Sequence, residues 1–201
     1  MNDAAPYFQA SYAEPSSAAY PAPVQKGALT LGQWLFVVGV ALAGGLLGIL
    51  GALIQETRGG LSFLGPVVLA PMVEEALKPS GIYYLQARRP ELLRSQTFTA
   101  ILCGISGLTF GYLESLVYLY IYHPDHSTQF VILRLGLTPP MHALFSFIVG
   151  LGINRQLIEG AYGRAPFPGA SRKFYLTAML LHGSYNLIVT VLAATGAWEV
   201  R

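Results

Sequence analysis

The chain of 201 residues is 53% hydrophobic and 11% charged, with a mean hydropathy of +0.49. Soluble domains carry about 25% charged residues, so this sequence has too few charges to coat a soluble protein of its length. Several apolar runs reach the ~20 residues with which a helix crosses a bilayer, and they lack the alternation of membrane-barrel strands. The composition therefore predicts an all-α, polytopic transmembrane helical bundle in a lipid bilayer. The net charge of +2 gives no indication of a nucleic-acid partner.

The first 27 residues differ in composition from the rest of the chain. They are rich in Ala, Pro, Ser and Tyr and show neither a helical nor a strand period. Such a segment buries too little apolar surface to offset the entropy of ordering it. It also lacks the basic start and apolar core of a cleavable signal peptide. We expect 1–27 to be a flexible N-terminal tail and 28–201 to form one transmembrane domain.

This transmembrane domain is predicted to contain about five spanning helices. Their approximate ranges are 32–54, 61–87, 97–122, 130–153 and 174–198. The first contains the glycine-rich run ALAGGLLGILGALI, whose small residues allow helices to approach one another closely in a membrane.

The distribution of Lys and Arg predicts how the bundle is oriented, because cytoplasmic loops are enriched in these residues. The two loops that follow the second and fourth spans are basic, with Arg88, Arg89, Arg94, Arg155, Arg164, Arg172 and Lys173. The two alternate loops contain only Arg58. We therefore expect a plasma-membrane protein with a cytoplasmic N-terminus and an exoplasmic C-terminus. Arg134, near an end of the fourth span, is expected to extend its side chain to the interface.

Ionisable side chains lie inside four of the five predicted spans. They are Glu74 and Glu75 in the second, Glu114 in the third, His142 in the fourth, and His182, accompanied by Asn186, in the fifth. A charge at the bilayer centre costs at least ~2.5–3.5 kcal/mol on insertion scales, so such residues mark functional sites more often than packing. Because their depths overlap, we expect them to meet in one polar, hydrated pocket between helices.

Helical spacing supports this pocket. Lys78 follows Glu75 by three residues and Glu74 by four, so it can pair with either carboxylate. Asn186 lies on the same helix face as His182, and Phe110 on the same face as Glu114.

Two consecutive prolines, Pro139 and Pro140, precede His142. They should break the fourth helix and free backbone carbonyls, which a membrane tolerates only beside protein or a wet cavity.

These motifs, in this order, resemble a known family. The pattern Glu74-Glu75-x-x-Lys78, Phe110-Gly111-x-x-Glu114, His142 and His182-x-x-x-Asn186 is similar to that of the PrsW family of intramembrane proteases. That family is related to the CPBP/Abi group, which includes the type II CAAX prenyl endopeptidases. The CAAX-type motif is FxxxH, whereas here Phe110 is followed by Glu114, which favours the PrsW branch and argues against a prenylated substrate.

The resemblance implies that 28–201 is a protease-like domain. Its substrate would be a membrane-anchored protein, such as an anti-sigma factor, cleaved in or near the membrane-spanning region. The oligomeric state is left open.

The residue types suit amide hydrolysis by an activated water. In the leading assignment Glu74 polarises the water with the help of His142 or His182. Lys78 supports Glu75, while His182 and Asn186 donate to the developing oxyanion. Adjacent helical residues point about 100° apart, so the sequence leaves open which glutamate is the base.

Three alternatives remain open on the sequence. His142, His182 and Glu74 are also a plausible ligand set for Zn²⁺, with an open position for water, although no HExxH motif is present. Buried Glu and His residues also build proton-coupled transporters, but no inverted repeat is visible. The third alternative is a non-catalytic membrane protein whose polar pocket only binds a partner.

Overall fold

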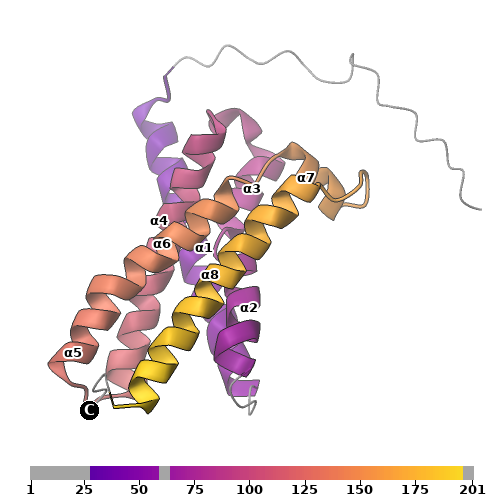
Figure 1. Cartoon of the computed structure of the whole chain (residues 1–201). Coiled ribbons are helices and arrows are strands. Elements are labelled where there is room, and N and C mark those ends of the chain that lie inside the picture. Colours follow the sequence, from indigo (N-terminus) through magenta and orange to yellow (C-terminus); the bar gives the residue numbers. More distant parts are fainter. Residues whose placement is uncertain (1–27, 59–63, 197–201) are drawn as a thin grey trace, which may run out of the picture.

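The computed structural model describes residues 28–58 and 64–196, and every regular element in these ranges is a helix (Figure 1). The elements are α1 (Leu31–Arg58), η2 (Gly65–Leu69), α2 (Ala70–Leu77), α3 (Ser80–Arg88), η3 (Pro90–Leu92), α4 (Gln96–Val117), η4 (Tyr118–Tyr122), α5 (Thr128–Val131), η5 (Ile132–Leu137), α6 (Thr138–Gly150), α7 (Arg155–Ala161) and α8 (Gly169–Ala194). The prediction of an all-α bundle is confirmed. The predicted tail lies outside the described residues, as does the end of the fifth predicted span.

Within residues 28–58 and 64–196, four helical stretches are long and apolar enough to cross a membrane. They are Leu31–Ile54, Gln96–Tyr122, Thr128–Gly150 and Gly169–Ala194. These stretches coincide with the first, third, fourth and fifth predicted spans. Large apolar side chains such as Leu47, Ile132 and Leu180 are more than half exposed on them, which suits helices that face lipid.

The second predicted span, 61–87, is interrupted within its described part. Helix α2 ends at Leu77 and α3 begins at Ser80, with Lys78 and Pro79 between them. Proline has no N–H and its ring disfavours a continuous helix. The carbonyl of Lys78 instead accepts a hydrogen bond from the Ser106 hydroxyl of α4, at 2.5 Å. The segment is thus two short helices whose break is satisfied by a neighbouring helix, and no single helix spans it.

The fourth predicted span does not break at its prolines, so that expectation is wrong. The wide π-helical turns of η5 continue directly into α6, where the prolines occupy the first turn. Proline is tolerated there because the first N–H groups of a helix need no intrahelical partner. Two hydroxyls satisfy the carbonyls beside them: Thr138 donates to Leu133 at 3.1 Å, and Ser115 of α4 donates to Arg134.

Helices α4 and α6 pack closely along one another, as Figure 1 shows. A Cβ atom added at Gly111 of α4 would lie 2.7 Å from Pro139 Cα, and one at Gly107 would overlap the His142 carbonyl. The glycine-rich run of α1 behaves similarly, because a Cβ at Gly44 would lie 2.9 Å from the Lys78 carbonyl. Small residues allow these approaches in a membrane, and they bring the polar residues of three helices together.

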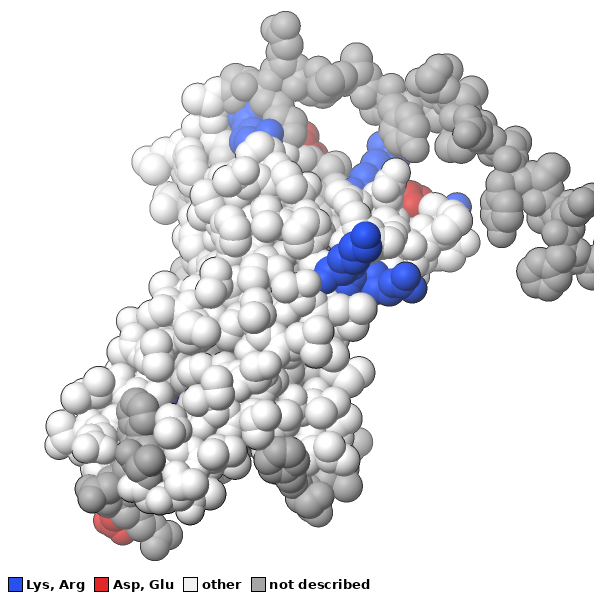
Figure 2. All heavy atoms as spheres, in the orientation of Figure 1, with Lys and Arg blue, Asp and Glu red and all other residues white. Residues whose placement is uncertain are grey.

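The predicted basic loops lie at one end of the bundle. On the face drawn in Figure 2, Lys and Arg gather near α3, α7 and the start of α8, whereas the long helices present a surface almost free of charge. The exposed residues include Arg88, Arg89, Arg155, Arg164, Arg172 and Lys173.

Candidate active site

Five polar side chains from three helices meet in the interior of the bundle. Glu74 and Glu75 come from α2, Lys78 caps the C-terminus of that helix, His142 comes from α6 and His182 from α8. All five are buried, with at most 4% of their surface exposed. This cluster, called the candidate site below, lies where α2, α6 and α8 contact one another, and α4 packs against α6 beside it.

Glu75 is held from two sides. Its Oε1 lies 2.8 Å from Lys78 Nζ and 2.8 Å from His182 Nδ1. An ionised carboxylate only accepts hydrogen bonds, so we assign the ring proton of His182 to Nδ1. The other ring nitrogen, Nε2, then keeps its lone pair.

His142 is held between Lys78 and Glu114. Lys78 Nζ lies 2.7 Å from His142 Nδ1, and because an ammonium group only donates, Nδ1 is the acceptor. The ring proton is therefore on Nε2, which donates to Glu114 Oε2 at 3.1 Å. Glu114 thus orients His142 from behind and does not face the centre of the candidate site.

Arg134 completes this chain of contacts, and the expectation that it extends to the interface is wrong. Its Nη1 lies 3.3 Å from Glu114 Oε2, its side chain is only 12% exposed, and its guanidinium lies 3.3 Å from the centre of the Tyr118 ring. The sequence signal for this pair is that Arg134 lies in one predicted span and Glu114, with no partner on its own helix, lies in the preceding span. Pairing inside the bundle removes the need to reach water.

Aromatic rings fix the charged and imidazole groups. Lys78 Nζ lies 4.3 Å over the Phe110 ring, which also meets the His142 ring edge at 5.1 Å between centroids. Phe145, which the sequence analysis did not single out, stacks on His182 at 5.2 Å and 20°. Apolar side chains dominate that stretch of α6, so nothing in the sequence distinguished Phe145 from a lipid-facing residue.

Glu74 differs from Glu75 in that no described side chain forms a hydrogen bond with it, although both glutamates have a buried Oε2 without a hydrogen-bond partner. Glu74 Oε2 lies 3.3 Å from Lys78 Nζ and 3.7 Å from His182 Nε2. The unengaged oxygen therefore faces the lone pair of a neutral imidazole across a distance that a small molecule can bridge.

The same region contains a possible metal ligand set. Glu74, His142 and His182 each offer one ligand atom, and these three atoms lie within 4.8 Å of one another. Two imidazoles and a carboxylate are ligand types that Zn²⁺ accepts in hydrolases.

Asn186 does not join the candidate site. Its Nδ2 donates to the Pro66 carbonyl at 2.8 Å, which ties α8 to η2. This contact gives the side chain a structural partner that the helical spacing from His182 did not indicate.

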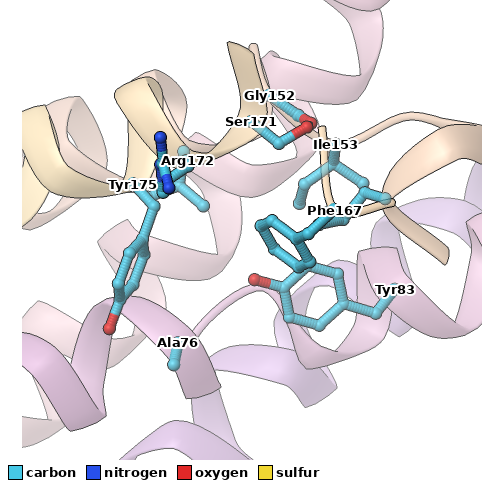
Figure 3. A pocket seen from close by; sticks show the side chains of 10 residues that line it. Ala76, Tyr83, Gly152, Ile153, Phe167, Ser171, Arg172 and Tyr175 are labelled. Carbon is cyan, nitrogen blue, oxygen red and sulfur yellow. The ribbon is translucent and has the colours of Figure 1, made fainter. Parts of the chain in front are cut away.

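An apolar pocket of about 200 Å³ lies nearby, between α2, α3, α6 and the start of α8 (Figure 3). The rings of Tyr83, Phe167 and Tyr175 surround it, and Arg172 lies at its side. The Tyr175 hydroxyl donates to the Met72 carbonyl at 2.5 Å. No residue of the candidate site lines this pocket, so its shape is not evidence about the chemistry.

Comparison with known protein families agrees with the resemblance. The family model described as PrsW family intramembrane metalloprotease matches residues 21–200. A search of the curated proteins and a search of the solved structures each gave no match. With four apolar helices long enough to span a bilayer, the chain is an integral membrane protein. It belongs to the PrsW family of intramembrane proteases.

Proposed function

We propose that the protein is an endopeptidase that hydrolyses a peptide bond in or near the membrane-spanning region of a membrane-anchored protein, with Glu74 as the general base and His182 as its partner. The resemblance suggests an anti-sigma-factor-like substrate. The kinship with the CPBP/Abi group remains an inference from the motifs.

The observation that carries this proposal is the separation of 3.7 Å between Glu74 Oε2 and His182 Nε2. Both atoms are hydrogen-bond acceptors when Glu74 is ionised and His182 carries its proton on Nδ1. A water molecule donating one hydrogen to each would be within reach of both, which is the geometry that general-base catalysis requires. His182 is favoured over His142 because both nitrogens of His142 already have partners.

The reaction then follows from the positions of these groups. Glu74 takes a proton from the water while the water oxygen attacks the carbonyl carbon of the scissile bond. As the tetrahedral intermediate collapses and the C–N bond breaks, Glu74 returns that proton to the leaving amine. Lys78, 3.3 Å from Glu74 Oε2, keeps positive charge beside the developing negative charge.

The remaining residues position these two. Glu75 and Phe145 hold the His182 ring, and Lys78 holds Glu75. His142, fixed by Glu114 and Phe110, anchors the Lys78 ammonium. Asn186 has no role in this scheme, since its amide donates to Pro66.

The family description implies a metal, for which the ligands would be Glu74, His142 and His182. The ligand types of Glu74, His142 and His182 suit Zn²⁺. However, Lys78 donates to the lone pair of His142 that would bind the ion and lies 3.3 Å from Glu74 Oε2. Only two free ligand atoms remain while Lys78 is in place, fewer than the three protein ligands typical of catalytic zinc sites.

The distribution of charge supports an orientation. We infer that the basic end of the bundle, with exposed residues such as Arg155, Arg164 and Lys173, faces the cytoplasm of a plasma membrane.

The proposal is tested by comparing membranes of cells that contain the wild type or Glu74→Gln. A single-span protein that persists intact only with the variant would be the substrate. Purified protein should then cleave this substrate, and His182→Ala should lose cleavage as Glu74→Gln does.

Glu91→Gln, in η3, and His126→Ala, in the loop before α5, serve as matched controls because both residues lie outside the candidate site. If both site variants accumulate normally and still cleave, the assignment is wrong. If even the wild type cleaves no membrane-anchored protein, a binding or transport role replaces it.

A further inference from the structure

We propose that Lys78 is an internal cation that occupies the place of a metal ion. Its ammonium group excludes Zn²⁺ from Glu74, His142 and His182, and the set binds Zn²⁺ tightly only when this side chain is removed. The inference does not depend on the proposed function, because metal binding is measured without a substrate.

The first support is the position of the ammonium group. Three acceptors surround Nζ: His142 Nδ1 at 2.7 Å, Glu75 Oε1 at 2.8 Å and Glu74 Oε2 at 3.3 Å. An ammonium has three N–H donors; two of them bond His142 and Glu75, and the third acceptor atom, Glu74 Oε2, lies at ion-pair distance. The Phe110 ring lies 4.3 Å away and closes another side, and the whole side chain is 0% exposed.

The second support is the single lone pair of His142. Its Nε2 carries the ring proton toward Glu114, so only Nδ1 can bind a cation. Zinc–nitrogen bonds are about 2.0–2.1 Å long, and an ion at that distance along the lone pair would overlap Nζ. One lone pair cannot serve both cations, so Lys78 must leave before the third ligand becomes available.

The third support is charge. Lys78 is the cation closest to both Glu74 and Glu75, and a buried carboxylate without a partner is strongly destabilising. Replacing Lys78 with a neutral residue therefore removes the obstacle and leaves two carboxylates that need a counter-ion. A divalent cation meets that need, so it should both bind more tightly and stabilise the variant.

The experiment uses the full-length protein in detergent, stripped with a chelator, and the probe is Zn²⁺. Binding is measured by calorimetric titration, and retained metal by mass spectrometry after desalting. Lys78→Met should bind Zn²⁺ at least ten-fold more tightly than the wild type and retain one ion per chain. Ten-fold corresponds to about 1.4 kcal/mol. Zinc should also raise the thermal unfolding midpoint of this variant more than that of the wild type.

Matched variants locate the bound ion. Lys78→Met combined with His182→Ala should lose the gained affinity, which assigns the ion to the candidate site. Lys173→Met, at an exposed lysine of α8, should bind zinc as the wild type does.

Two results would overturn the proposal. One is that the wild type retains one zinc ion per chain and that His182→Ala abolishes this retention. The other is equal zinc affinity in the wild type and Lys78→Met. If Lys78→Met does not accumulate, Lys78→Gln is titrated in its place. Zinc titration of the wild type and of His182→Ala is a sufficient test even without the Lys78 variants. Zinc retention that depends on His182 contradicts the exclusion of zinc by Lys78, and a lack of such retention supports it.

Discussion

Arg134 of η5 and Glu114 of α4 form an ion pair within the bundle, with 3.3 Å between Nη1 and Oε2. The side chains are 12% and 14% exposed, and the same Glu114 oxygen accepts the ring N–H of His142. The pair therefore connects the outer part of the bundle to an imidazole of the candidate site. It fixes both the orientation and the protonated nitrogen of that ring.

We predict that Arg134→Met lowers cleavage about 10- to 100-fold, by analogy with partners that orient the histidines of metal sites. Without the guanidinium, Glu114 loses its counter-ion and orients His142 less well. The double variant Arg134→Met/Glu114→Gln should lose much less than the sum of the two single losses, since the two residues act as a unit. Additive losses in this cycle would show that Arg134 and Glu114 affect cleavage independently and not as an ion pair.

The two adjacent glutamates are predicted to respond differently to loss of charge. Glu74→Gln should abolish cleavage, with a loss of at least ~10²-fold, and change stability little, because Glu74 contacts Lys78 at 3.3 Å without a hydrogen bond. Glu75→Gln removes the charge that pairs with Lys78 and bonds His182. It should lower the thermal unfolding midpoint clearly more than Glu74→Gln does. If Glu74→Gln lowered the midpoint more than Glu75→Gln, Glu75 would be the base and Glu74 the residue that holds His182.

Helix packing at Gly111 is predicted to limit the candidate site. In Gly111→Ala the new Cβ would lie 2.7 Å from Pro139 Cα and 3.0 Å from the His142 ring. Overpacking of this kind costs about 1–3 kcal/mol and should displace His142, so both stability and activity should fall. Gly136→Ala is the matched control, because nothing lies within 4 Å of its added Cβ. Equal thermal midpoints of the two variants would contradict the close approach of α4 and α6.

The hydroxyl of Ser106 is predicted to stabilise the break between α2 and α3. Ser106→Ala leaves the buried Lys78 carbonyl without its side-chain donor, which costs about 1–3 kcal/mol. The loss should appear as a lower unfolding midpoint, whereas Ser184→Ala, an exposed serine of α8, should leave the midpoint unchanged.

The inferred orientation is tested by labelling introduced cysteines from outside intact cells. The chain has one native cysteine, Cys103, which is fully buried and should not react. A membrane-impermeant maleimide should label Asp125→Cys, in the loop after η4, but not Arg164→Cys at the basic end. Labelling of Arg164→Cys alone would invert the orientation.

The sequence was sufficient to predict the class of fold and the presence of ionisable residues inside the bundle. Both follow from large, additive free energies: the transfer of apolar runs into lipid, and the cost of isolated charges there. Glu74 and His182 stood out because ionisable side chains are unfavourable in hydrocarbon and are retained there mainly for a function.

The partners within the bundle could not be predicted in the same way. Which acceptor Lys78 approaches, or whether Arg134 turns inward, depends on tertiary distances that helical spacing does not contain. The local effect of the prolines at 139–140 was also misjudged, since hydroxyls from Ser115 and Thr138 made a continuous helix possible. Asn186 shared a helix face with His182, yet a carbonyl of η2 lay within its reach.

The interruption of the helix at Lys78–Pro79 gives the backbone an electrostatic role. Peptide dipoles along a helix leave about half a negative charge at its C-terminal end, and α2 ends directly at Lys78. An unbroken helix would have spread this field to the membrane surface. The break instead places the negative end of the helix dipole deep in the bundle, where it favours a cation beside the two carboxylates. The main-chain carbonyls at the end of α2 thus add to the negative charge that keeps the Lys78 ammonium group in a hydrocarbon environment.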